Sequence, residues 1–204
     1  MYKLYYSPGS CSMGVHVALL ECNQEVSLEK INVGAGEGQK PEYLKINSRG
    51  QVPVLVDGDQ VLREGAAILT HVLEKHNSQL LPKSGKERDH AIEWMMFGNA
   101  TMHPAYGRVF FLRRNQTTEG PLWDAAIAGI NKLWADVEQR LLLQPYVCGE
   151  RITIGDILLT VYANWVIPGI VLGPNVKKLL KNVSSRPSYQ KALATEQVEY
   201  KAAA

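Results

Sequence analysis

The 204-residue sequence has few cysteines and no unbroken hydrophobic run long enough to cross a bilayer. Its three cysteines, Cys11, Cys22 and Cys148, are too few and too scattered for a disulfide framework, which favours a reducing compartment. The longest apolar stretch, residues 157–173, is interrupted by a proline and a glycine and falls short of the about 20 residues that a membrane-spanning helix needs. We therefore expect a cytoplasmic protein that does not enter a membrane.

An excess of charge and a secretory signal are also lacking. Lys and Arg number 22 against 20 Asp and Glu, so the net charge is only +2 and does not favour nucleic acid or an anionic membrane as a partner. The N-terminus lacks the basic start and the apolar core of a secretory signal. His71, His76 and Cys148 do not follow a metal-ligand spacing, so we predict no metal site. Small neutral or mixed-charge ligands fit this composition best.

The first twelve residues combine a strand pattern, a turn and a cysteine at the start of a helix. Apolar and polar residues alternate over residues 1–6, which is typical of a strand, and Pro8-Gly9 indicates a turn. Ser10 and Ser12 have hydroxyl groups suited to capping the first free amides of the helix that follows. The positive end of that helix would stabilise a bound anion or the thiolate of Cys11 itself, although a lone cysteine is more often a small buried hydrophobe.

Residues 1–77 have the pattern of one layered α/β unit. Alternating stretches predict three further strands, at residues 26–33, 51–56 and 60–62. The order strand, helix, strand indicates a parallel crossover, and Asp57-Gly58 predicts a hairpin. Apolar residues at helical spacing predict a helix from Ala66 onward. The glycines of residues 34–38 lack the spacing of a dinucleotide fingerprint, so we interpret them as a flexible loop.

Composition and periodicity change together after residue 77. Residues 78–86 contain serine, proline and glycine, which predicts a linker between two domains. Residues 87–204 lack strand patterns and their apolar residues recur at helical spacing, so we predict an all-α second domain. Thr153 and Asp156 have the spacing of a capping box and predict a well-defined helix start.

Four motifs together resemble those of cytosolic glutathione S-transferases. They are YYSPGSCS at 5–12, NSRGQVPVL at 47–55, LREGAAIL at 62–69 and ITIGD at 152–156. Cys11, and His103 within the sequence TMHP, are similar to the bacterial beta class, in which cysteine replaces the catalytic tyrosine or serine of other classes. The resemblance covers nearly the full length. It implies a thioredoxin-like α/β N-terminal domain followed by an all-α C-terminal helical domain.

The resemblance also implies the residues of a glutathione site. Catalytic roles are expected for Cys11, His103 and Tyr6. The residues expected to bind glutathione are Ser10, Cys11, Val52, Pro53, Glu64, Gly65, Thr101 and His103. Val52, followed by Pro53 in the cis form, would bind the cysteinyl backbone of glutathione, and Glu64 would meet the ammonium group of its γ-glutamyl end. The amides at the helix start beside Gly65 would bind its α-carboxylate.

One departure from the family leaves a part of this site open. The lysine that relatives place after the second strand has no counterpart in residues 34–38. The glycine carboxylate of glutathione would then rely on Lys40 or His103.

The function implied by the resemblance is conjugation of reduced glutathione to small hydrophobic electrophiles, as in detoxification, by a homodimer. Glutathione would be a cosubstrate, the helical domain would bind the electrophile, and Cys11 would add thiol-disulfide exchange. Two alternatives stay open: a glutathione-dependent monothiol oxidoreductase or peroxidase, and a non-catalytic binding protein that shares the fold. No motif identifies the electrophile or the balance between conjugation and redox activity.

Overall fold

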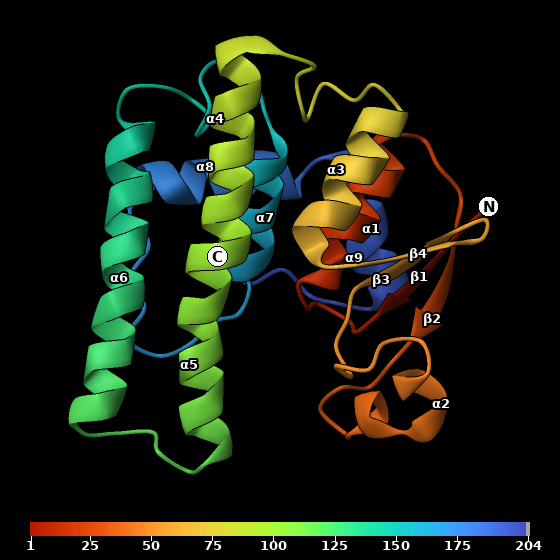
Figure 1. Cartoon of the computed structure of the whole chain (residues 1–204). Coiled ribbons are helices and arrows are strands. Elements are labelled where there is room, and N and C mark those ends of the chain that lie inside the picture. Colours follow the sequence, from red (N-terminus) through yellow and green to blue (C-terminus); the bar gives the residue numbers. More distant parts are fainter. Residues whose placement is uncertain (203–204) are drawn as a thin grey trace. The chain divides into compact units, whose positions relative to one another are not determined.

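The computed structural model describes residues 1–202, and Figure 1 shows their helices and strands. In chain order the elements are β1 Tyr2–Tyr6, α1 Ser12–Glu21, β2 Val26–Lys30, η1 Glu37–Gln39, α2 Pro41–Leu44, β3 Val54–Asp57, β4 Gln60–Arg63, α3 Gly65–Lys75, α4 Gly85–Met96, η2 Phe97–Met102, α5 His103–Arg114, α6 Pro121–Leu141, α7 Ile154–Ala163, α8 Pro174–Ser184 and α9 Pro187–Glu196. Two predictions need correction. β2 ends at Lys30 instead of residue 33, and the short helices η1 and α2 follow the glycine-rich turns where we expected only a loop.

The four strands form one mixed sheet in the order β2-β1-β3-β4. β1 pairs with β2 in parallel, which confirms the crossover through α1, and β3 pairs antiparallel with both β1 and β4. The hairpin between β3 and β4 turns at Gly58, whose φ of +63° suits glycine. Tyr2, Leu4 and Tyr6 of β1 are all buried, as the alternation of the strand predicts. The central strands β1 and β3 therefore carry the core of the sheet.

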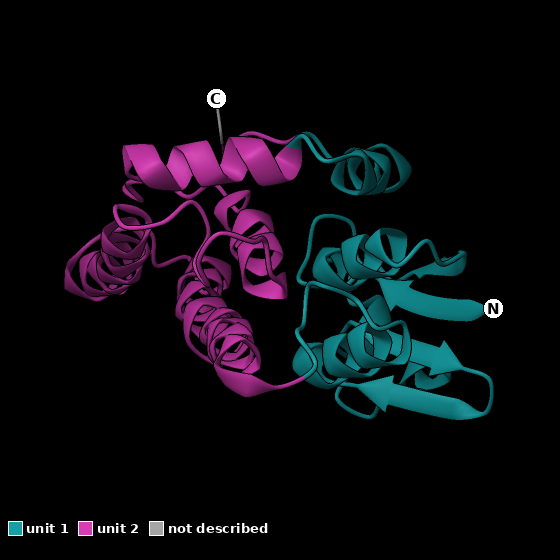
Figure 2. Cartoon of the chain, turned by 90° about the horizontal axis from the view of Figure 1, so that it is seen from above, with its two compact units in different colours: residues 1–83, 185–199 teal, residues 84–184, 200–204 magenta. Residues whose placement is uncertain are grey.

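The chain divides into two compact units, which Figure 2 shows in separate colours. Unit 1 comprises Met1–Lys83 and Ser185–Glu199, and unit 2 comprises Ser84–Ser184 with the last residues from Tyr200. This division differs from the predicted domains 1–77 and 87–204 because α9 packs against α1 and so belongs with the sheet. Residues 203–204, at the end of the predicted helical domain, lie outside the described residues.

Unit 2 is built around α7, which is buried along its whole length and packs against α4, η2 and α8. A Cβ atom at Gly155 would lie 2.8 Å from the Cβ of Trp94, so glycine lets α7 approach α4 closely. The capping box at the start of α7 is confirmed. Oδ2 of Asp156 accepts hydrogen bonds from the Thr153 backbone N–H at 2.7 Å and from the Thr153 hydroxyl at 3.1 Å.

None of the helices in residues 1–202 is both long enough and apolar enough to span a bilayer.

Candidate active site

The loop between β1 and α1 places Cys11 at the start of a helix, as the sequence predicts. Gly9 has a φ of +65°, and its N–H donates to Oε2 of Glu196 in α9 at 2.9 Å. The Ser10 hydroxyl oxygen accepts a hydrogen bond from the Ser12 N–H at 3.3 Å, so Ser10 satisfies one free amide of the helix. The buried Ser12 hydroxyl instead donates to a carbonyl of the preceding loop at 3.3 Å, which corrects its expected capping role. These contacts hold the loop that carries Cys11.

Cys11 lies beside the residues that precede β3. Its thiol donates to the Val52 carbonyl, with 3.6 Å between Sγ and the oxygen, and the Val52-Pro53 bond is cis as expected. Burial raises the pKa of Cys11 to about 11, and the Glu64 carboxylate adds to the rise, while nearby backbone N–H groups and a serine hydroxyl oppose it. At neutral pH Cys11 is therefore a neutral thiol that can donate a hydrogen bond.

The N-terminus of α3 supplies the other part of the predicted site in unit 1. α3 begins at Gly65, and Glu64 before it has a φ of +71°, which is uncommon for a residue with a side chain. The Ile68 N–H bonds to the Glu64 carbonyl, so the amides that precede it have no partner within the helix. The exposed Glu64 carboxylate pairs with Nη1 of Arg49 at 3.0 Å. Free N–H donors beside a carboxylate suit a ligand that carries both a carboxylate and an ammonium group.

The remaining predicted residues, Thr101 and His103, lie in unit 2. Thr101 is exposed in η2, and His103 begins α5. The His103 ring lies against Tyr162 and Trp165, with ring centroids 5.6 and 5.4 Å apart. Burial lowers the pKa of His103, so its imidazole is neutral at pH 7 and one of its nitrogens can accept a proton or a hydrogen bond.

Trp165 is the centre of an aromatic cluster in unit 2. Its ring centroid lies 4.8 Å from that of Tyr162, 5.5 Å from that of Tyr106 and 5.4 Å from that of Phe110. We call these four residues and His103 the aromatic cluster. No local pattern in the sequence predicts this cluster, because its members come from α5, the end of α7 and the loop after α7.

Comparisons with known proteins find one family over most of the chain. Family models of the glutathione S-transferase N-terminal and C-terminal domains match residues 1–74 and 100–187. The chain belongs to the glutathione S-transferase family. Glutathione S-transferase GstA of Escherichia coli O157:H7 is 28% identical to it over 204 residues, which cover 95% of this chain and 98% of the relative.

Solved structures agree with this assignment. A glutathione S-transferase from Xylella fastidiosa is 25% identical with a TM-score of 0.86, over 98% of this chain and 100% of that one. A glutathione transferase homologue from Sulfitobacter, solved with bound glutathione, is 25% identical with a TM-score of 0.83, over 96% of this chain and 98% of that one. The thioredoxin-like N-terminal domain and the all-helical C-terminal domain are thereby confirmed.

Tyr6 and Lys40 have little contact with the rest of the site in this glutathione S-transferase. Tyr6 is buried at the end of β1, and among residues 1–202 its hydroxyl makes no hydrogen bond to Cys11. Burial and the charge of Glu196 raise the pKa of Tyr6, so its phenol stays protonated at neutral pH. Lys40 is exposed and pairs with Glu37 at 3.2 Å. The catalytic role of Tyr6 stays a prediction.

Two residues of this transferase contact the site although the sequence analysis did not single them out. Arg49 pairs with Glu64 and lies within a family motif, so its position in that motif was an available signal. Glu196 accepts hydrogen bonds from Gly9 and from Nδ1 of His16, the latter at 2.9 Å. Because Gly9 and Glu196 are 187 residues apart, no local pattern connects them. In the described part of the chain, no three His, Cys, Asp or Glu side chains are grouped to hold a metal ion.

Proposed function

We propose that the chain binds reduced glutathione in unit 1 and transfers it to small hydrophobic electrophiles. The main support for this proposal is the hydrogen bond from the Cys11 thiol to the Val52 carbonyl. This bond brings a thiol at a helix start next to the backbone that precedes β3. In this proposal the Val52 backbone binds the cysteinyl part of glutathione, and the Glu64 carboxylate meets the ammonium group. The free amides at the start of α3 bind the α-carboxylate. The glutathione-bound Sulfitobacter homologue supports this proposal.

Cys11 acts in conjugation as a hydrogen-bond donor. Since its pKa is about 11, Cys11 is a neutral thiol. When glutathione binds, this thiol turns from the Val52 carbonyl to the glutathione sulfur and, together with the amides at the start of α1, stabilises the thiolate. The glutathione thiol releases its proton to solvent, and its thiolate attacks the electrophilic carbon. A carbon–sulfur bond forms and the leaving group departs with its bonding electrons. The aromatic cluster supports flat, apolar electrophiles as the second substrate.

Thiol-disulfide exchange is a second proposed activity of Cys11, in keeping with a beta-class transferase. The Cys11 thiolate attacks glutathione disulfide, forms a mixed disulfide with one glutathione and releases the other as a thiolate. A further glutathione thiolate then attacks the mixed disulfide, which regenerates the Cys11 thiolate and releases glutathione disulfide, so the cycle exchanges glutathione between its thiol and disulfide forms without net oxidation or reduction. Because the thiolate fraction of Cys11 is small at neutral pH, this exchange should be slow and should accelerate as the pH rises.

Cys11→Ala should keep a substantial fraction of the conjugating activity and lose the exchange activity. The helix-start amides that stabilise the glutathione thiolate remain in the variant, whereas the sulfur that forms the mixed disulfide is gone. Conjugation of 1-chloro-2,4-dinitrobenzene, exchange with glutathione disulfide, and the intact mass of the protein measure the three properties. Cys22→Ala is the matched control. Loss of both activities with glutathione binding intact would contradict the donor role.

A glutathione-affinity column tests the function itself and separates the alternatives. A conjugating enzyme is retained by the column and eluted by free glutathione, and it turns over at least one member of a panel of electrophiles. A monothiol oxidoreductase is retained but conjugates none of them. Failure of the folded protein to bind glutathione would overturn both the transferase and the oxidoreductase readings and leave a non-catalytic binding protein.

The chain is further proposed to form a homodimer through unit 2. Met96 in α4 and Phe111 in α5 are 42% and 59% exposed, which is unusual for large apolar side chains on neighbouring helices. Sedimentation velocity should give a dimer for the wild type, and Phe111→Glu should shift the protein toward the monomer. A wild type that sediments only as a monomer would remove this proposal.

A further inference from the structure

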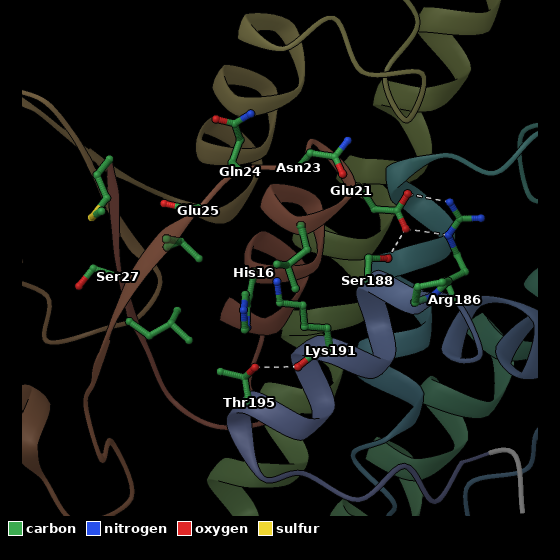
Figure 3. Close-up of a pocket in the computed structure, with 15 residues that line it drawn as sticks. His16, Glu21, Asn23, Gln24, Glu25, Ser27, Arg186, Ser188, Lys191 and Thr195 are labelled. Carbon is green, nitrogen blue, oxygen red and sulfur yellow. Dashed lines mark hydrogen bonds and ion pairs between the residues drawn. The ribbon is translucent and has the colours of Figure 1, made fainter.

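A cavity of about 800 Å³ lies within unit 1, separate from the proposed glutathione site. Its walls are the second half of α1, the edge strand β2 and the helix α9, as Figure 3 shows. None of the residues predicted to bind glutathione lines this cavity. Its volume falls within the about 300 to 1,000 Å³ that is typical of small-molecule sites.

His16 presents a polar atom to this cavity from an otherwise buried position. The residue is only 2% exposed, and its Nδ1 donates to Oε1 of Glu196 at 2.9 Å. Among residues 1–202 no hydrogen bond is made by its other ring nitrogen, Nε2, and His16 lines the cavity (Figure 3). Nε2 is not among the buried side-chain atoms without a hydrogen bond, so it is open to the cavity and accessible to water or to a ligand.

The α9 wall of the cavity carries a positive charge without a partner. Lys191 lines the cavity, is exposed, and has no ion-pair partner in the described chain. The carboxylate of Glu21 nearby is already neutralised, because Arg186 Nη2 donates to it at 2.6 Å and Ser188 also bonds to it (Figure 3). Glu25, the other acidic residue of the lining, comes from the turn before β2 and not from α9. The α9 side therefore favours an anionic group.

Part of the cavity wall is apolar, since Leu20, Val26 and Leu28 line the cavity from α1 and β2. We propose that the cavity binds a small organic carboxylate. Its carboxylate meets the Lys191 ammonium group on the side of the cavity that His16 also lines, and its apolar body packs on these three side chains. Apolar walls that hold the body and a few polar atoms that orient it are the usual composition of a small-molecule site.

Titration with 3-phenylpropionate tests this site, with 3-phenylpropanamide as the uncharged probe of the same shape. Calorimetry should detect binding of the carboxylate and much weaker binding of the amide. The His16 ring signals in NMR spectra should shift as the carboxylate saturates the protein. Lys191→Ala should weaken binding by about fivefold, the effect of losing one partly solvated charge contact. Lys178→Ala, which removes an exposed lysine in unit 2, should leave the affinity unchanged.

A variant that fills the cavity makes the test independent of charge. Ser27 lines the cavity from β2 and is half-buried, so Ser27→Trp should occupy the apolar space and abolish binding. Binding that leaves the His16 signals unmoved would place the probe elsewhere in the protein and overturn the proposal. Equal affinity for the amide, unchanged affinity in Lys191→Ala, or no binding of the carboxylate by the folded protein would each do the same.

Discussion

Replacing Asp156 by alanine should lower the free energy of unfolding by about 3 to 4 kcal/mol. Asp156 is fully buried and accepts hydrogen bonds from three donors: the Val147 N–H at 2.9 Å, the Thr153 N–H at 2.7 Å and the Thr153 hydroxyl at 3.1 Å. Alanine would leave these donors without a partner in the interior and would remove the cap of α7, the central helix of unit 2. The four tryptophans, at positions 94, 123, 134 and 165, all lie in unit 2. Urea unfolding followed by tryptophan fluorescence therefore measures the effect directly.

Asp156→Asn is the matched control because its amide oxygen still accepts a hydrogen bond but cannot be ionised. Burial raises the pKa of Asp156 from 3.8 to about 6, so the folded protein binds the proton more tightly than the unfolded chain. This contribution to stability is complete below about pH 4 and is lost as the pH rises through 6. The wild type should gain up to about 3 kcal/mol relative to Asp156→Asn between pH 7 and pH 4. A loss below about 1 kcal/mol in Asp156→Ala would contradict the capping argument.

Glu196→Ala should lower the free energy of unfolding by about 3 to 5 kcal/mol, because it removes a buried carboxylate and leaves both of its hydrogen-bond donors without a partner. The side chains of His16 and Glu196 are 2% and 0% exposed, and Glu196 joins Nδ1 of His16 to the Gly9 N–H. Without the carboxylate, α9 loses two of its polar contacts with α1 and with the loop that precedes Cys11. Thermal unfolding followed by circular dichroism measures the loss, and hydrogen exchange at the amides of α1 locates it in unit 1.

The reactivity of Cys11 gives this second prediction an independent readout. Because the Gly9 N–H would no longer be held, the loop should open more often and Cys11 should be alkylated faster in Glu196→Ala than in the wild type. Glu196→Gln keeps an oxygen acceptor and should lose much less stability. Equal stability of Glu196→Ala and the wild type, with equal alkylation rates at Cys11, would show that the Glu196 hydrogen bonds neither stabilise unit 1 nor hold the loop before Cys11.

Local patterns predicted those parts of the fold and site that depend on neighbouring residues. The alternation in residues 1–6, the Asp57-Gly58 turn and the three-residue spacing between Thr153 and Asp156 each led to an element that is present. The position of Cys11 at a helix start was predicted in the same way, because a strand, a turn and a helix follow each other within twelve residues. Arg49, which pairs with Glu64, also lies in one of the four motifs, so its position in the sequence was a local signal for the site.

The sequence by itself determined the order of an α/β unit and a helical unit, because periodicity and capping depend on residues a few positions apart. Only the tertiary structure decided that α9 belongs with the sheet, that Glu196 holds Gly9, and that four other aromatic rings meet around Trp165. These contacts join residues far apart in the chain and depend on how the helices pack. The protonation state of Cys11 also depends on the tertiary structure, since the burial that raises its pKa to about 11 exists only in the folded chain.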